Sequence, residues 1–115
     1  MHKLEFLDLY IFKGLTNLND GFASETIKYF SQADFKVVLY NVEQYGLGIY
    51  GIEPWKNGEY YDCQVYGSYA NDCTDPAWYK TVFDNYVKEG IDLQYAASYH
   101  LPEDIRKEFM IYENL

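Results

Sequence analysis

The chain has few of the residues that metal sites and disulfide frameworks need. Its 115 residues include only two cysteines, Cys63 and Cys73, and two histidines, His2 and His100. A zinc site needs several such ligands in close spacing, and the histidines lie far from both cysteines in sequence. The sequence therefore predicts no metal site and no cofactor.

Long apolar runs are also missing. No stretch approaches the roughly 20 apolar residues that span a bilayer. The acids Glu5 and Asp8 interrupt the first apolar segment, whereas a secretory signal needs that segment unbroken. We therefore expect a cytoplasmic protein without a membrane partner, in which Cys63 and Cys73 are reduced, partly buried thiols.

Basic residues are scarce, with nine Lys and Arg against 18 Asp and Glu, for a formal net charge of −9. This balance argues against direct binding to nucleic acid through its phosphates and against an anionic membrane surface. Hydrophobic residues make up 49% of the chain, which excludes the composition of a disordered protein. The length predicts a single domain over residues 1–115.

Turn and cap residues divide the chain into elements. In the N-terminal part we expect a strand over 4–12, a loop over 14–21, a helix over 21–34 and a strand over 35–42. The helix rests on the spacing of Phe22, Ile27, Phe30 and Ala33, with Asp20 or Asn19 as its N-cap. Both strands rest on their aromatic and β-branched residues.

The C-terminal part has clearer turn residues. A strand over 49–53 is expected to end at Pro54 or lie at a sheet edge, because proline donates no ladder hydrogen bond. Asn57-Gly58 predicts a type I′ turn into a returning strand over 60–66. Its alternation predicts that Tyr61, Cys63 and Val65 face the core, while Tyr60, Asp62, Gln64 and Tyr66 face away.

Asp75-Pro76 predicts the start of a helix, with Asp75 as N-cap and a stop at Gly90. Its apolar face is expected to contain Trp78, Val82, Phe83, Tyr86 and Val87. A strand over 93–99 follows, and then a short terminal helix with Pro102 in its first turn. The expected apolar face of that helix consists of Ile105, Phe109 and Tyr112.

These elements follow the order β-α-β-β-β-α-β-α. Strands joined by a hairpin favour an antiparallel or mixed sheet over a parallel one. The sequence therefore predicts a single-domain α+β fold with helices packed mainly on one face of the sheet.

Patterns that could indicate catalysis are incomplete. Gly46-Leu47-Gly48-Ile49-Tyr50-Gly51 matches G-x-G-x-x-G, but it leads into a strand-like segment instead of a helix, so it does not predict nucleotide binding. A catalytic thiol would need Cys63 or Cys73 beside His100, and no local motif joins them. The carboxylates of Glu53, Glu59 and Asp62 suit a solvated hairpin better than glycoside hydrolysis. We expect a protein that is not an enzyme.

Aromatic and acidic residues are abundant instead. Tyr, Phe and Trp make up 20% of the chain, and 14 residues are tyrosine. Between Glu53 and Asp75, five acids stand against one base, Lys56, and several aromatic residues lie among them. Aromatic anchors with carboxylates are typical of a surface that binds a basic protein. The predicted partner-binding residues are Glu53, Trp55, Glu59, Tyr60, Asp62, Tyr66 and Asp72.

In this acidic, tyrosine-rich character, the chain resembles the small immunity proteins of bacterial polymorphic and contact-dependent growth-inhibition toxin systems. Aromatic segments such as Tyr50-Gly51-Ile52-Glu53-Pro54-Trp55 and Asp75-Pro76-Ala77-Trp78-Tyr79 carry this likeness. The resemblance implies a tight one-to-one inhibitor of a toxin domain, often a basic nuclease, that acts in the cytosol of the producing cell.

Two other functions stay open on the sequence alone. One is a phage-type inhibitor that mimics DNA and blocks a nucleic-acid-binding complex. Such a mimic needs carboxylates repeated along an extended surface, and nine basic residues interrupt the acids here. The other is a small enzyme or ligand-binding domain whose pocket is lined by tyrosines.

Overall fold

The structure is a computed structural model that describes residues 1–21 and 26–112. Five strands form one antiparallel sheet in the order β1-β5-β2-β3, with β4 also paired to β2. The strands are β1 (Phe30–Ser31), β2 (Gly48–Lys56), β3 (Glu59–Tyr60), β4 (Gln64–Val65) and β5 (Gln94–His100). The helices are α1 (Lys3–Phe6), a π-helical segment (Leu7–Ile11), α2 (Gln32–Tyr45), a 3₁₀ turn (Tyr66–Ser68), α3 (Pro76–Lys88) and α4 (Glu103–Glu108).

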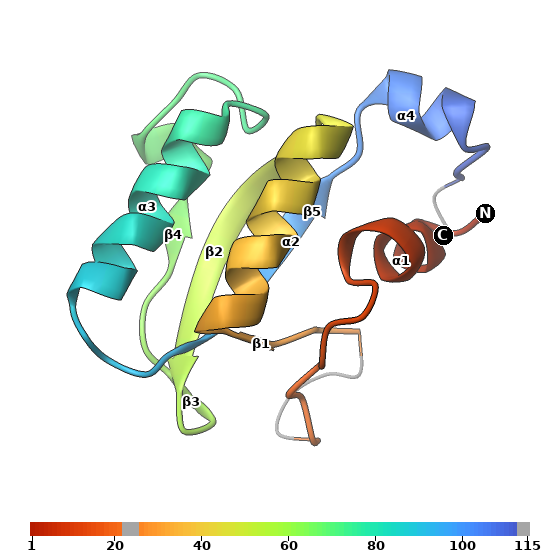
Figure 1. Ribbon diagram of the computed structural model, residues 1–115. Coiled ribbons are helices and arrows are strands. Elements are labelled where there is room, and N and C mark those ends of the chain that lie inside the picture. The colour runs from red at the N-terminus through yellow and green to blue at the C-terminus, as the bar shows by residue number, and fades with distance from the viewer. Residues whose placement is uncertain (22–25, 113–115) are drawn as a thin grey trace.

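Helices α2 and α3 lie side by side across one face of the sheet (Figure 1). Three rings join them to β5. Tyr95 stacks on Phe35 of α2 with ring centroids 5.1 Å apart, and it meets Phe83 of α3 edge-on at 5.2 Å. Because all three side chains are buried, this trio forms the centre of the core.

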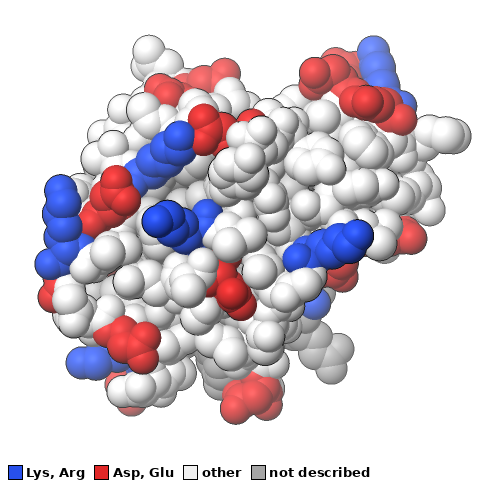
Figure 2. Space-filling model, viewed as in Figure 1, with Lys and Arg blue, Asp and Glu red and all other residues white. Residues whose placement is uncertain are grey.

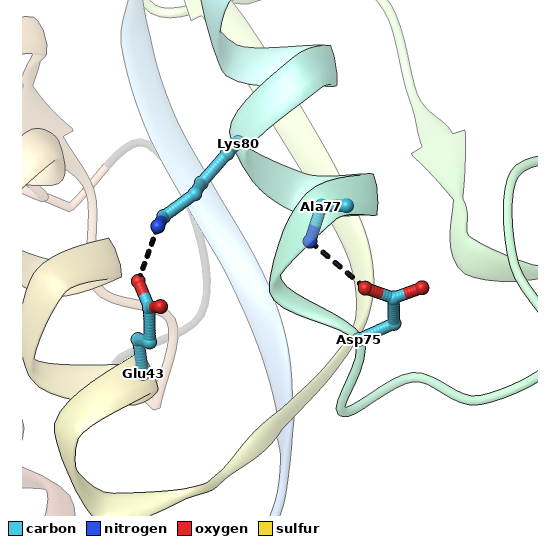
Figure 3. Close-up of polar contacts among 4 residues, drawn as sticks. All are labelled: Glu43, Asp75, Ala77 and Lys80. Carbon is cyan, nitrogen blue, oxygen red and sulfur yellow. Dashed lines mark hydrogen bonds and ion pairs between the residues drawn. The ribbon is translucent and has the colours of Figure 1, made fainter.

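Helix α3 begins as the sequence predicts. The Asp75 carboxylate accepts a hydrogen bond from the Ala77 N–H at 3.0 Å, and Pro76 occupies the first turn (Figure 3). Lys80 on this helix forms an ion pair with Glu43 of α2, which connects the two helices at their exposed side (Figure 3). The predicted stop at Gly90 is also confirmed, since the residue has a φ of 71°.

The two ends of the described chain meet beside α2. The Met1 amino group donates a hydrogen bond to the Met110 carbonyl at 2.7 Å. Phe6 of α1 packs edge-on against Phe109, with ring centroids 4.9 Å apart. These contacts explain why the predicted strand over 4–12 is wrong: packing against the C-terminal segment favours a helix, whose first turn is capped by His2.

Of the two elements predicted between 21 and 42, the strand over 35–42 is wrong, and the helix over 21–34 is confirmed only for residues 32–34, the start of α2. Residues 22–25, and with them Phe22, lie outside the described part of the chain. Residues 26–29 form a turn and an irregular segment, and the helix begins only at Gln32. The Ser31 hydroxyl caps it by accepting the Asp34 N–H, a role predicted for Asp20 or Asn19.

The segment 35–42 is helical although its residues favour strands. The buried side chains, Phe35, Val38, Leu39 and Val42, follow a helical spacing and form one face of α2. Gly46 then ends the helix in a left-handed conformation with a φ of 70°. Burial of that face against the sheet stabilises the helix by more than the β propensity of valine and tyrosine disfavours it.

The strand predicted over 49–53 is confirmed, but it runs on through Pro54 at the centre of the sheet. The Pro54 carbonyl accepts the Tyr61 N–H, so the backbone edge of Pro54 that carries its carbonyl and nitrogen faces the returning chain. On that edge β3 pairs with Trp55 and Lys56, and β4 pairs with Gly51 and Ile52. Pro54 lies in the gap between these two ladders, where no backbone N–H donor is needed.

The Asn57-Gly58 turn is confirmed, with φ angles of 53° and 79° that match a type I′ turn. The returning strand is not continuous, because residues 61–63 leave the ladder. The predicted facing is wrong for Cys63 and Val65, which are both exposed, and for Tyr66, which is partly buried and packs against the core.

The C-terminal elements agree more closely with the prediction. The strand over 93–99 appears as β5, and Trp78, Val82, Phe83 and Tyr86 of α3 are buried, whereas Val87 is exposed. Pro102 is the N-cap of α4 instead of part of its first turn. Ile105 is buried and Phe109 packs on the core, whereas Tyr112 is exposed.

The fold class is therefore confirmed as α+β, with an antiparallel sheet and the two long helices on one face. After the N-terminal helix the elements also follow the predicted order β-α-β-β-β-α-β-α. The first three elements of this order are formed by other residues than expected. The segment predicted as a helix, 21–34, contains β1 and the start of α2, and the segment predicted as the second strand, 35–42, lies within α2.

Gly48 gives a test of this packing. A Cβ added there would lie 2.5 Å from the Cys73 Sγ and 3.2 Å from the Cys73 carbonyl carbon. We expect Gly48→Ala to lower the free energy of unfolding by about 1–3 kcal/mol, measured by urea denaturation, because the added methyl group would force β2 and Cys73 apart.

Gly67→Ala is the matched control, since nothing lies within 4 Å of a Cβ added there. We expect it to change stability by less than about 0.5 kcal/mol. Adding Cys73→Ala to Gly48→Ala is expected to recover part of the loss. Equal stability of Gly48→Ala and the wild type would contradict the close approach of β2 and Cys73.

Candidate partner-binding surface

The second face of the sheet holds a shallow hollow. On this face Gly51 pairs with Ser98 and Glu53 pairs with Ala96 across β2 and β5. Since these side chains are small or absent around Glu53, the centre of the face is recessed, with a volume of about 290 Å³. Tyr50, Cys63, Val65 and Ile27 also line the hollow.

Three of the predicted partner-binding residues meet beside this hollow. Trp55 and Tyr60 are directly opposite each other in the β2–β3 pair, and their rings meet edge-on at 6.1 Å. The Trp55 indole N–H donates to the Glu53 Oε1 at 2.7 Å. We refer to Glu53, Trp55 and Tyr60 as the hairpin cluster.

The hairpin cluster has a rigid base. Tyr29 is fully buried and packs edge-on against Trp55, with ring centroids 5.3 Å apart. The Tyr29 N–H donates to the Asn17 side chain, which connects this ring to the preceding loop. In contrast, the Tyr60 side chain is 59% exposed. The cluster thus combines a fixed indole with an accessible phenol ring.

The Glu53 carboxylate sets the electrostatics of the cluster. Burial first, and then the charge of Glu53, raise the pKa of Tyr29 and of the Cys63 thiol. Tyr60 also has a raised pKa, caused by desolvation and by the charges of Cys63, Asp62 and Glu53. Within residues 1–21 and 26–112, no Lys or Arg lies within ion-pair distance of Glu53.

The other predicted residues are spread around the cluster. Glu59 pairs with Lys56, one residue along from the Trp55–Tyr60 pair, and so points to the opposite face of the hairpin. Asp62 accepts a hydrogen bond from the Tyr86 hydroxyl of α3 at 2.8 Å. Its carboxylate is thus engaged in holding the returning chain to the helix layer.

Tyr66 and Asp72 lie farther along the sheet. The ring of Tyr66 is 6.4 Å from that of Tyr50, at the other side of the hollow. Asp72 precedes Cys73, whose carbonyl accepts the Ile49 N–H at the start of β2. At about 3.3 Å per residue, that end of β2 is roughly 20 Å from Trp55. The structure therefore does not bring Asp72 into the hairpin cluster.

Sequence reasoning missed several residues of the hollow. Tyr50 faces it because a bulge between Ile49 and Gly51 breaks the alternation of β2. Ile27 reaches it from a segment that was predicted as helix. The run Ala96-Ala97-Ser98 was the available signal, because small residues inside a strand leave room above the sheet.

The structure brings one of the two thiols close to His100, since a Cβ added at Gly48 would lie 2.5 Å from the Cys73 Sγ and 3.2 Å from the His100 Cβ. Desolvation raises the pKa of both Cys63 and Cys73, which keeps them protonated near neutral pH. The Tyr50 hydroxyl lies 2.7 Å from the His100 Nδ1, and within the described residues the His100 ring forms no hydrogen bond with a cysteine. Among the described residues, no group of three His, Cys, Asp or Glu side chains is placed to hold a metal ion.

Comparisons with protein-family models, with curated proteins and with solved structures find no match to this chain. Of the helices within the described ranges, none has the length and apolar character to cross a membrane.

Asp62 supplies a pH-dependent contribution to stability. Burial opposes ionisation, but hydrogen bonds from Gln64, Tyr86 and the Cys63 N–H lower the pKa of its carboxyl overall. Because the folded pKa lies below the unfolded one, the stabilisation is complete above the unfolded value and is lost as pH falls through the folded value. We expect Asp62→Asn to cost about 1 kcal/mol at pH 7, measured by urea denaturation.

The difference between Asp62→Asn and the wild type is expected to shrink as the pH falls below about 4. Asp84→Asn, an exposed change on α3, is the control and is expected to be neutral. A difference that stays constant down to pH 2 would show that the Asp62 charge does not stabilise the fold.

Proposed function

We propose that this protein is an immunity protein that binds and neutralises a cognate bacterial toxin domain in the cytoplasm of the cell that makes it. The observation that carries the proposal is the hairpin cluster, in which a half-buried carboxylate and an exposed tyrosine lie beside a hollow in the sheet face opposite α2 and α3. The toxin surface is expected to be basic, as in many nucleases.

Burial and charge favour protein binding at this cluster. Tyrosine and tryptophan bury a large area at a small cost in conformational entropy, and Trp55 is already fixed by Tyr29 and Glu53. The net charge of −9 steers a basic partner toward the molecule. The cluster can therefore supply both the anchor and part of the attractive field.

The opposite face has a different charge pattern. Over α2 and α3, Lys side chains lie between Asp and Glu side chains (Figure 2). Lys80 pairs with Glu43 there, so part of this charge is neutralised within the molecule. This mixture of signs does not suit a mimic of DNA, which needs an extended run of carboxylates. It also makes the helix face a useful control surface.

The first test is to recover the partner from a lysate of the native cell with tagged protein, at low and at moderate salt. We expect one basic protein in near-equal amount. Tyr60→Ala is expected to weaken the complex by about 10-fold to 100-fold, as at other central aromatic contacts.

Tyr40→Ala is the matched control, because Tyr40 is 62% exposed on α2 and Tyr60 is 59% exposed on β3. We expect Tyr40→Ala to bind like the wild type. Equal loss in both variants would assign binding to neither face, and loss only in Tyr40→Ala would move the interface to the helices. An empty pull-down at both salts would overturn the proposed function.

A second test uses the purified complex and the salt dependence of its association rate. Reversing two acids of the hairpin, Glu53→Lys with Glu59→Lys, is expected to slow association by about 10-fold at low salt and to flatten its salt dependence. The control is Glu103→Lys with Glu108→Lys on α4, which changes the net charge equally. Equal slowing in both double variants would show general charge attraction without a role for the hairpin.

A further inference from the structure

We infer that the hairpin cluster is a receptor for one arginine side chain, with the guanidinium bound between the Glu53 carboxylate and the Tyr60 ring. The inference rests on the proposed function for its biological role, since the arginine would belong to the toxin. Its chemistry can be tested on this protein alone.

The Glu53 carboxylate is prepared for a cation. The Trp55 indole N–H fixes its Oε1, and among the described residues its Oε2 accepts no hydrogen bond. Glu53 is half-buried, so its charge is screened less than that of a fully exposed acid. A bound cation would compensate a charge that the described part of the chain leaves without an ion pair.

The aromatic side of the receptor is Tyr60. Its ring stands opposite Trp55 and remains accessible, and both side chains share the face of the hairpin on which Glu53 lies. A cation over such a ring is attracted by the π electrons. A guanidinium is planar, so it can stack on the ring and still direct N–H groups at a carboxylate.

The hollow suits the aliphatic part of the same side chain. Its lining is mostly apolar, with Val65 and Ala96 beside Glu53. Arginine and lysine both bury their methylene groups along apolar surface while the charge stays at the rim. The preference for arginine or lysine at this site therefore depends on the charged group. Guanidinium is more weakly hydrated than ammonium, which favours arginine at a half-buried carboxylate.

The chain offers a direct reporter of this site. It contains two tryptophans, so an ¹⁵N-labelled sample gives two indole N–H signals. The Trp55 indole N–H is bound to Glu53, whereas the buried Trp78 indole N–H donates to the Cys73 carbonyl. Trp78 thus serves as an internal control for non-specific effects of added peptide.

The experiment is a titration with two blocked tripeptides of equal charge, acetyl-Gly-Arg-Gly-amide and acetyl-Gly-Lys-Gly-amide, at low salt. We expect a saturable shift of the Trp55 signal with the arginine peptide and little movement of Trp78. The arginine peptide is expected to bind about fivefold more tightly than the lysine peptide.

Two variants locate the charge that is responsible. Glu53→Gln keeps an oxygen acceptor for the Trp55 indole but removes the charge, and we expect it to weaken arginine binding at least about fivefold. Glu108→Gln makes the same chemical change at an exposed position on α4 and is expected to leave the titration unchanged.

Each other outcome overturns the inference. Equal affinity for the two peptides, no saturable shift of Trp55, or unchanged binding in Glu53→Gln would each do so. Failure here is distinct from failure of the proposed function. A partner recovered from the lysate with no arginine preference would leave the immunity function standing, while an arginine preference with an empty pull-down would leave only the receptor.

Discussion

The antiparallel pairing of β2 with β5 is the constraint on which the rest of the structure depends. It fixes which side chains point to each face, because neighbouring residues of a strand alternate. Tyr95 therefore meets Phe35 and Phe83 under the helices, while its neighbour Ala96 lies opposite Glu53 on the other face. This register thus determines which side chains form the core and which line the hollow. A slip by one residue would exchange these two sets of side chains.

The abundance of tyrosine follows from this two-sided design. Tyr95 fills the core, and burial together with the charges of Glu89 and Asp92 raises its pKa to about 12. Tyr61 and Tyr86 donate to Glu89 and Asp62, so their hydroxyls connect the returning chain to α3. Tyr60 alone among these four projects into solvent at the hairpin. A residue with an apolar ring and a polar end can serve in all of these environments.

How much the sequence predicts depends on how local the cause is. The Asn57-Gly58 turn, the Asp75 cap and the stop at Gly90 are decided by backbone conformation within a few residues, and all three are confirmed. The segments 4–12 and 35–42 were predicted as strands from β propensity, which tertiary packing overrides. For α2 the helical spacing of its buried residues was present in the sequence, whereas the partner of α1, Phe109, lies at the far end of the chain.

The candidate site shows the same division. The hairpin turn predicts that Trp55 and Tyr60 are neighbours, and the structure adds Glu53 through the indole hydrogen bond. The acids that follow in the sequence do not join them, because residues 61–63 leave the ladder and direct Asp62 to α3. An acidic segment of sequence thus becomes one compact site and several dispersed charges. In the proposed function the dispersed charges act at long range on a basic partner, while the hairpin cluster is the part of this segment that we propose recognises a particular side chain.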